Sequence, residues 1–173
     1  TETYESLSGR VPIDLLESDW VIRAFLDRAP TSGFYHIAKR LLDLLLGLVG
    51  LVALALLFPL IALVILIDSG RPVIFTQKRL GRGGKPYMIY KFRTMKSRSD
   101  MEKEALVTAT NDPRITGIGK FLRKSHLDEL PQIINVLRGE MSLVGPRSER
   151  VELVQVFQKE VPFYRARMLV KPG

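Results

Sequence analysis

The adjacent carboxylates Asp128 and Glu129 are the residues of this sequence best suited to covalent or metal chemistry. Apolar residues follow them at the spacing of one helix face and lead to a glycine that favours a helix C-terminus: Leu130, Ile133, Ile134, Leu137 and Gly139. Proline is tolerated in a first turn, so Pro131 predicts a helix that begins near Asp128, with Asp128 or its neighbour as N-cap. The positive end of the helix dipole, with Arg123 and Lys124 just before it, would keep both carboxylates ionised at neutral pH.

This pair also has a simpler interpretation, in which Asp128 only caps the helix and Glu129 is an ordinary first-turn acid. The chemical interpretation is phosphoryl transfer, which needs a nucleophile or base, cations around the phosphate oxygens and usually a divalent metal. Carboxylates supply the nucleophile and a ligand for a hard cation, so Mg²⁺ is the expected metal and Asp128 its expected ligand. His36 and His126 lie too far apart to suggest a zinc site, and the sequence has no cysteine.

Candidate cations for the phosphate come from several stretches: Lys91, Arg93, Arg123 and Arg147. Guanidinium groups can bind phosphate in a bidentate manner. Pro146 stiffens the turn that carries Arg147. The chain has 26 basic and 18 acidic residues, a net charge of +8, which favours an anionic partner. Residues 70–99 hold nine basic residues and no acid, although a solvated basic face would give the same pattern.

A long apolar segment of the sequence indicates that this chemistry takes place at a membrane. Residues 44–67 carry no charge, and as one helix they would be about 36 Å long, enough to cross a bilayer. A buried core helix is the alternative, but a domain of this size rarely covers a helix that is apolar on every face. Asp43 precedes the segment at helical spacing from Lys39 and Arg40, where an ion pair could form.

Basic residues flank the apolar segment on both sides, so both flanks are predicted to face the cytoplasm. Pro59 removes one hydrogen bond inside the segment, which predicts a kink or break. A re-entrant hairpin of two half-helices satisfies both observations, whereas a kinked spanning helix is the alternative. We therefore expect a re-entrant helix over residues 38–68, broken at Pro59.

The remaining segments predict a mixed fold. Residues 11–26 suggest a surface or interfacial helix within an N-terminal linker, 1–37. Residues 73–77 and 87–92 resemble strands separated by a glycine-rich turn, and hence a β-hairpin. A short amphipathic helix is expected within 115–125. The predicted fold is thus α+β and helix-rich, with a re-entrant membrane helix, a hairpin and amphipathic surface helices, and with the catalytic region in 69–173.

Residues 39–173 resemble the bacterial sugar transferases, the monotopic phosphoglycosyl transferases that start glycan assembly on a polyprenol phosphate. Four blocks carry the resemblance in order: KRLLDLLLG, PVIFTQKRLGRGGKPYMIYKFRTM, NDPRITGIGKFLRKSHLDELPQIINVLRGEMSLVGPR and KPG. The resemblance, from residue 39 to residue 173, covers about three quarters of the chain. The stretch YESLSGRVPIDLL is similar to a junction in long-form members, so we expect the catalytic part of such a protein. Members of the family continue beyond KPG, and we expect the catalytic region to be incomplete at that end.

The resemblance implies a two-step reaction, in which Asp128 attacks a UDP-sugar and passes the sugar-1-phosphate to undecaprenyl phosphate. It implies Glu129 as the second catalytic residue, Mg²⁺ as cofactor, and Lys91, Arg93, Arg123, Pro146 and Arg147 as substrate-binding positions. It also implies a location at the cytoplasmic face of the bacterial inner membrane and a role in starting exopolysaccharide or O-antigen-type glycan assembly. The alternative is a non-catalytic basic module that recruits acidic lipids or a partner enzyme. No nucleic-acid partner is expected, and the oligomeric state, including a homo-oligomer, stays open.

Overall fold

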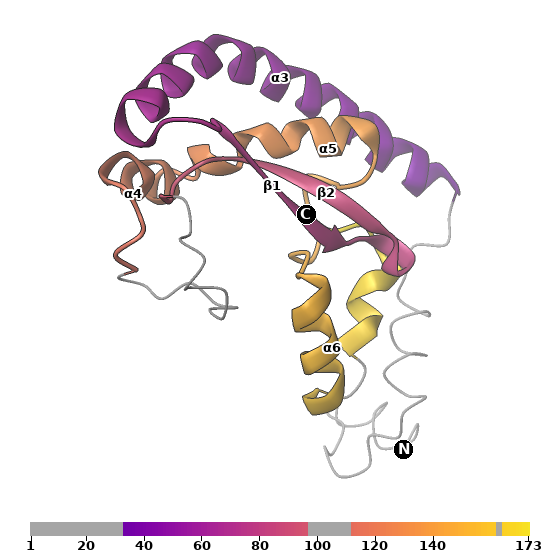
Figure 1. Ribbon diagram of the computed structural model, residues 1–173. Coiled ribbons are helices and arrows are strands. Elements are labelled where there is room, and N and C mark those ends of the chain that lie inside the picture. The colour runs from indigo at the N-terminus through magenta and orange to yellow at the C-terminus, as the bar shows by residue number, and fades with distance from the viewer. Residues whose placement is uncertain (1–32, 97–111, 162–163) are drawn as a thin grey trace, which may run out of the picture.

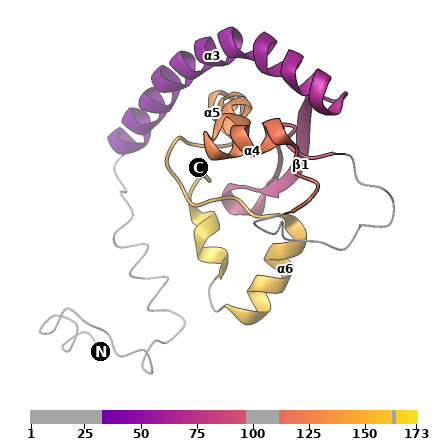
Figure 2. The same cartoon turned by 90° about the vertical axis from the view of Figure 1, so that its left-hand side faces the viewer.

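The computed structural model describes residues 33–96, 112–161 and 164–173. The N-terminal helix expected at 11–26 lies outside these ranges. In the described residues a long helix, α3, arches over a β-hairpin and the short helices α4 and α5, while α6 lies on the side away from α3 (Figures 1 and 2). The predicted helix-rich α+β class is confirmed at this level.

Helix α3 runs without interruption over Gly33–Ser69 and contains Pro59. The predicted break at Pro59 is therefore wrong. A proline removes one hydrogen bond, and a long helix absorbs this loss by bending while both sides stay helical. Figure 1 shows α3 as a continuous arch. Gly70, with φ of 72°, follows its last turn.

Only a narrow face of α3 is covered by the rest of the protein, at Asp43, Gly47, Leu54, Ile61 and Ile65. Most of its other aliphatic side chains are exposed, with Leu56 at 73% and Ile67 at 79%. Among the described residues α3 is the single helix long and apolar enough to cross a membrane. A bare apolar surface of this length marks a lipid or protein interaction site.

The predicted hairpin is present. Strand β1, Ile74–Leu80, pairs antiparallel with β2, Pro86–Phe92, and the short 3-10 helix η2, Arg82–Gly84, joins them. Lys91 of β2 lies opposite Phe75 of β1. Side chains alternate along β2, so Ile89 and Lys91 lie on one face and Phe92 on the other, with Ile89 and Phe92 buried in two different apolar clusters.

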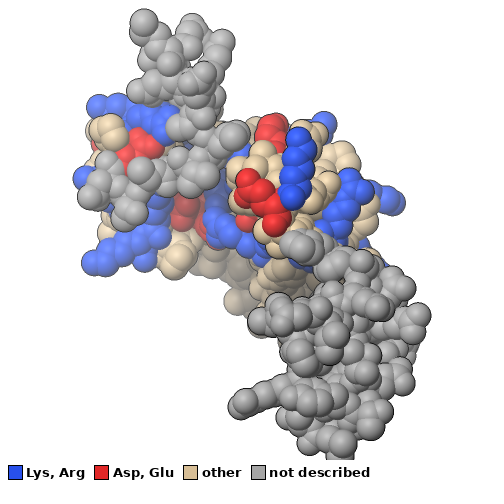
Figure 3. All heavy atoms as spheres, turned by 90° about the horizontal axis from the view of Figure 1, so that it is seen from below, with Lys and Arg blue, Asp and Glu red and all other residues tan. Residues whose placement is uncertain are grey.

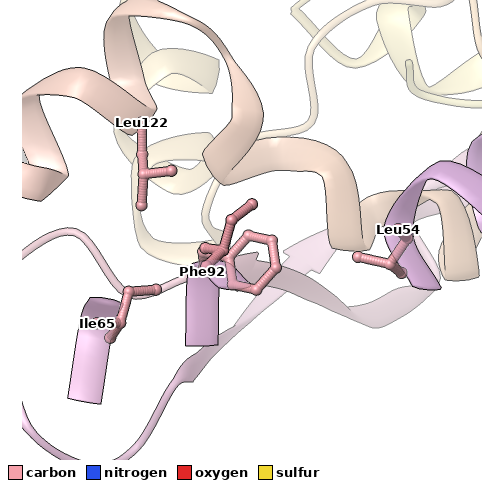
Figure 4. Close-up of a cluster of buried hydrophobic side chains, with 5 residues drawn as sticks. Leu54, Ile65, Phe92 and Leu122 are labelled. Carbon is pink, nitrogen blue, oxygen red and sulfur yellow. The ribbon is translucent and has the colours of Figure 1, made fainter. Parts of the chain in front are cut away.

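The largest apolar cluster joins α3 to the hairpin and to α4, Gly117–Lys124. Figure 4 shows its members from these elements: Leu54 and Ile65 of α3, Phe92 of β2 and Leu122 of α4. Ile65 and Phe92 are each 1% exposed. This cluster fixes the end of β2 against the C-terminal half of α3.

The helix predicted between Asp128 and Gly139 begins differently from the expectation. Residues Leu127–Gln132 form a 3-10 helix, η4, and α5 covers Ile133–Arg138. The N-cap is His126, in the left-handed region at φ 58°, and not Asp128 or an immediate neighbour. Pro131 cannot donate the bond that would continue an α-helix, so the first turn is tightened. The C-terminal end at Gly139, with φ of 80°, agrees with the prediction. Beyond it lie α6, Val151–Glu160, and the 3-10 helix η5, Tyr164–Leu169.

Candidate active site

An open cavity of about 830 Å³ lies between the hairpin, the segment after β2, α4 and η4. Its ionisable lining is strongly basic: Arg79, Lys91, Arg93, Lys96, Arg114, Arg123, Arg147 and Arg150. Its two acids are Asp128 and Glu129. On the face seen from below in Figure 3, basic side chains cover more of the surface than acidic ones. Such a surface attracts an anion with several negative charges.

Asp128 is 8% exposed, on the η4 turn at the cavity wall. Among the described residues no other side chain donates a hydrogen bond to it. Burial raises the pKa of this carboxyl, while Lys91 and Arg123 lower it by a smaller amount. The pKa of Asp128 therefore shifts upward, against the direction that the helix dipole and the cations alone would give, because burial outweighs them.

Glu129 has the opposite electrostatic balance. Its Oε1 lies 2.5 Å from Lys91 Nζ and 3.5 Å from Arg147 Nη2. Burial raises its pKa, but the hydrogen bond from Lys91 and the charges of Lys91 and Arg147 more than offset this, and the pKa is below its ordinary value. The two adjacent carboxyls thus differ: Glu129 is held ionised by cations, and Asp128 faces the cavity without such a partner.

Arg123 is placed by a close approach between α4 and the strand segment at Thr94. Its Nε donates to Thr94 Oγ1 at 2.9 Å. A Cβ at Gly119 would lie 2.1 Å from the Thr94 carbonyl oxygen, so only glycine permits this contact. Thr116 caps α4 by accepting from the Gly119 N–H at 2.9 Å. The guanidinium of Arg123 is thereby aimed into the cavity from a fixed helix.

The other residues predicted to bind phosphate differ in how they reach the cavity. Arg93 lines the cavity, but its Nε donates to the Met95 carbonyl at 2.9 Å and its Nη1 donates to the Arg71 carbonyl, so part of its fork is already used. Arg147 reaches the cavity with a side chain that is 65% exposed. Pro146 does not line this cavity.

Three arginines of the lining were not predicted as ligands: Arg79, Arg114 and Arg150. Arg79 and Arg150 form an isolated antiparallel bridge between β1 and the start of α6. Arg114 pairs with Asp112 through Nε at 2.8 Å and Nη2 at 2.5 Å, which lowers the Asp112 pKa to about 2. Their common cavity arises from tertiary contacts, and no local spacing in the sequence signals it.

The site suits a metal that the substrate helps to bind. In the described part of the chain no three potential ligands gather as a protein-only metal cage. Mg²⁺ is often held by one or two carboxylates together with substrate phosphate oxygens. Asp128 and Glu129, beside a cavity that can hold phosphates, are compatible with that second mode.

Residues 34–173 match the family model described as "Bacterial sugar transferase". The chain belongs to this family. The similarity to curated relatives extends over most of this chain. The UDP-N-acetylgalactosamine-undecaprenyl-phosphate N-acetylgalactosaminephosphotransferase of Aeromonas hydrophila is 40% identical over 169 residues, which cover 98% of this chain and 38% of that protein.

Two further relatives agree. The UDP-glucose:undecaprenyl-phosphate glucose-1-phosphate transferase of Escherichia coli (strain K12) is 44% identical over 146 residues, covering 83% of this chain and 31% of that protein. The exopolysaccharide production protein PSS of Rhizobium leguminosarum bv. phaseoli is 40% identical over 140 residues, covering 79% of this chain and 70% of that protein. The chain thus spans about a third of the length of the two longer relatives. The family predicted from the sequence is confirmed.

Proposed function

We propose that this chain transfers a sugar-1-phosphate from a UDP-sugar to undecaprenyl phosphate and so starts exopolysaccharide or O-antigen-type glycan assembly. The names of the relatives support the substrates. The single observation that carries the chemistry is Asp128, a carboxylate without a partner side chain among the described residues, on the wall of a cavity with eight basic side chains. A lipid-recruiting module has no need for such a buried acid.

In the first half-reaction an oxygen of the Asp128 carboxylate attacks the β-phosphorus of the UDP-sugar. The bond from that phosphorus to the bridging oxygen breaks, and UMP leaves. The sugar phosphate is then joined to Asp128 through an acyl phosphate. In the second half-reaction a phosphate oxygen of undecaprenyl phosphate attacks the same phosphorus. The bond to Asp128 breaks, the carboxylate is restored, and undecaprenyl diphosphate-linked sugar is the product.

The surrounding residues have distinct parts in this proposal. Burial of Asp128 leaves its carboxylate poorly solvated and hence more reactive toward phosphorus. Glu129 keeps the Lys91 ammonium beside the reacting groups, and Arg123 and Arg147 offset charge on the diphosphate oxygens. Mg²⁺, held by Asp128 and the substrate phosphates, would neutralise further charge on the diphosphate.

We infer that α3 enters and leaves the bilayer on the same side. Its first turns contact the loop after α5, through Asp43 and Leu143. Its last turns pack on Phe92 and Leu122. A helix that crossed the membrane could not keep both ends against one water-exposed body. With basic residues on both flanks, this arrangement supports a re-entrant helix at the cytoplasmic face of the inner membrane.

Cysteine labelling tests this topology, because the sequence has no native cysteine. Single cysteines would replace Gly33, the first residue of α3, and Lys85, in the hairpin that follows α3, and both positions are exposed. Neither should react with a membrane-impermeant maleimide added to intact spheroplasts, and both should react after lysis. Labelling of one position from outside would contradict the re-entrant proposal.

The catalytic proposal is tested by incubating the membrane-reconstituted chain with a panel of UDP-sugars, Mg²⁺ and undecaprenyl phosphate. UMP release should occur with at least one sugar and should be lost in Asp128→Asn. Glu160→Gln, an exposed acid on α6, is the matched control and should keep full activity. UMP release that survives Asp128→Asn would contradict the proposal.

A further inference from the structure

The polar end of α3 is bonded to the loop that carries Arg147. Asp43 is 2% exposed, and its Oδ1 accepts from Lys39 Nζ at 2.9 Å, from the Ser142 hydroxyl at 3.0 Å and from the Leu143 N–H at 3.1 Å. The pair with Lys39 follows from helical spacing and would need no burial. The bonds to Ser142 and Leu143 join distant parts of the chain, so the carboxylate has a tertiary role.

The same turn of α3 holds the end of α5. Both terminal nitrogens of Arg40 donate at 2.7 Å, one to the Val136 carbonyl and one to the Leu137 carbonyl. The Val136 carbonyl also accepts from the Gly139 N–H at 2.9 Å, so Arg40 adds a second donor there and supplies a donor to the Leu137 carbonyl in the last turn. Two neighbouring side chains of α3 thus fix both the end of α5 and the loop that follows it.

The turn between Leu143 and Arg147 has little freedom to move. A Cβ at Gly145 would lie 2.4 Å from the Lys171 carbonyl oxygen, so the two backbones are in direct contact. The Gly173 N–H donates to the Pro146 carbonyl at 3.1 Å. A shift at Leu143 is therefore passed along a stiff backbone.

Arg147 itself depends on that backbone for its position. Its side chain is 65% exposed, and its contact with Glu129 Oε1, at 3.5 Å, is long. The Arg147 carbonyl accepts from Arg167 Nη2 at 2.7 Å, which is again a backbone contact. Side-chain packing does not hold the guanidinium at the cavity, so the anchored loop must do so.

We propose that Asp43 is a positioning residue for the transferase reaction: it ties the Ser142–Arg147 backbone to α3 and so holds the Arg147 guanidinium beside Glu129. This inference rests on the function proposed above. Because α3 carries the exposed apolar surface, the arrangement also makes the position of a phosphate-binding cation depend on how that helix sits in lipid.

Three variants separate positioning from general stability. Asp43→Ala removes every side-chain acceptor, whereas Asp43→Asn keeps an oxygen for the Leu143 N–H. Asp68→Ala is the matched control, since Asp68 is exposed at the other end of the same helix. We expect kcat to fall by about 10- to 100-fold in Asp43→Ala, because small misplacements of a catalytic group cost this much. The loss should be smaller in Asp43→Asn and absent in Asp68→Ala.

A double-mutant cycle shows whether the effect passes through Arg147. Once Arg147→Lys has removed the guanidinium fork, Asp43→Ala should lose most of its effect on kcat. In an Arg93→Lys background its full effect should remain. Equal effects in both backgrounds, or a kcat for Asp43→Ala equal to that of Asp68→Ala, would overturn the proposal.

Amide hydrogen exchange provides a readout that does not require turnover. Exchange over residues 142–147 should be faster in Asp43→Ala than in the wild-type protein and unchanged in Asp68→Ala. If the wild-type chain releases no UMP from any UDP-sugar, the transferase proposal fails, and exchange alone then decides whether Asp43 holds the loop. Unaltered exchange in Asp43→Ala would overturn the inference.

Discussion

Lys91 and Glu129 form an ion pair on the cavity wall, with Lys91 Nζ 2.5 Å from Glu129 Oε1. The two residues come from β2 and η4, and the pair brings an ammonium group within electrostatic reach of Asp128. It therefore links the charge states of both carboxyls of the site. This coupling makes the pH dependence of the reaction a direct test of the arrangement.

Lys91→Met should move the acidic limb of the UMP-release rate to higher pH. Asp128 must be ionised to attack, and its pKa is raised by burial and partly lowered by Lys91, so removing this cation raises the pKa further. The measurement is the pH profile of kcat/KM. Lys78→Met, on an exposed residue of β1, should leave the limb in place. An unchanged limb in Lys91→Met would show that Lys91 does not act on the ionisation of Asp128.

Asp128→Asn should stabilise the protein while it abolishes turnover. The folded-state pKa of Asp128 is raised, so the ionised form is disfavoured by folding, and stability rises as pH falls through that pKa. Replacement by a neutral amide should add about 1 kcal/mol to the free energy of unfolding at pH 7. The gain should disappear in acid, where Asp128 is protonated. Melting curves at pH 7 and in acid provide the test, and a lower melting temperature at pH 7 would contradict it.

Gly119→Ala should disrupt the site, whereas Gly117→Ala on the same helix should not. The new methyl at Gly119 would meet the Thr94 carbonyl at 2.1 Å and force α4 away from the strand segment that Arg123 contacts. We expect a loss of about 2 kcal/mol in stability, typical of overpacking, with reduced turnover. Nothing lies within 4 Å of a Cβ at Gly117. Equal stability of the two variants would contradict the close contact.

Much of the fold follows from local patterns in the sequence. The strand-like runs at 73–77 and 87–92 and the glycine-rich turn between them predict the hairpin, and the apolar spacing with Gly139 predicts the end of α5. The break at Pro59 was wrong because a single missing hydrogen bond does not outweigh the bonds on either side of it. The predicted helix start near Asp128 is wrong because Pro131 changes the first turn into a 3-10 helix, η4, and does not only set where an α-helix begins.

The site was predicted less completely than the fold. Asp128, Glu129 and Lys91 are brought together as the sequence predicts. The role of Asp43 depends on Ser142 and Leu143, and such distant partners leave no periodic signal in the sequence. The same holds for Arg79 and Arg150, whose shared cavity is a product of tertiary packing.

Arg123→Lys and Arg147→Lys should each lower kcat/KM by about 10-fold or more, because lysine keeps the charge but loses the planar fork that binds phosphate at two points. Arg138→Lys is the matched control, since Arg138 is exposed, stacks on Tyr90 and does not line the cavity. Steady-state kinetics with the preferred UDP-sugar supply the measurement. Rates near those of the control would mean that the two arginines belong to a solvated basic face.

The covalent step is the central claim, and trapping the intermediate tests it most directly. The protein would be incubated with UDP-sugar and Mg²⁺ in the absence of undecaprenyl phosphate, treated with hydroxylamine to convert an acyl phosphate into a stable hydroxamate, and digested with trypsin. Cleavage after Lys124 and Arg138 isolates residues 125–138, which contain both carboxylates. We predict one equivalent of UMP and fragment ions that assign the modification to Asp128. A modification on Glu129, or UMP release without any modified carboxylate, would contradict the account.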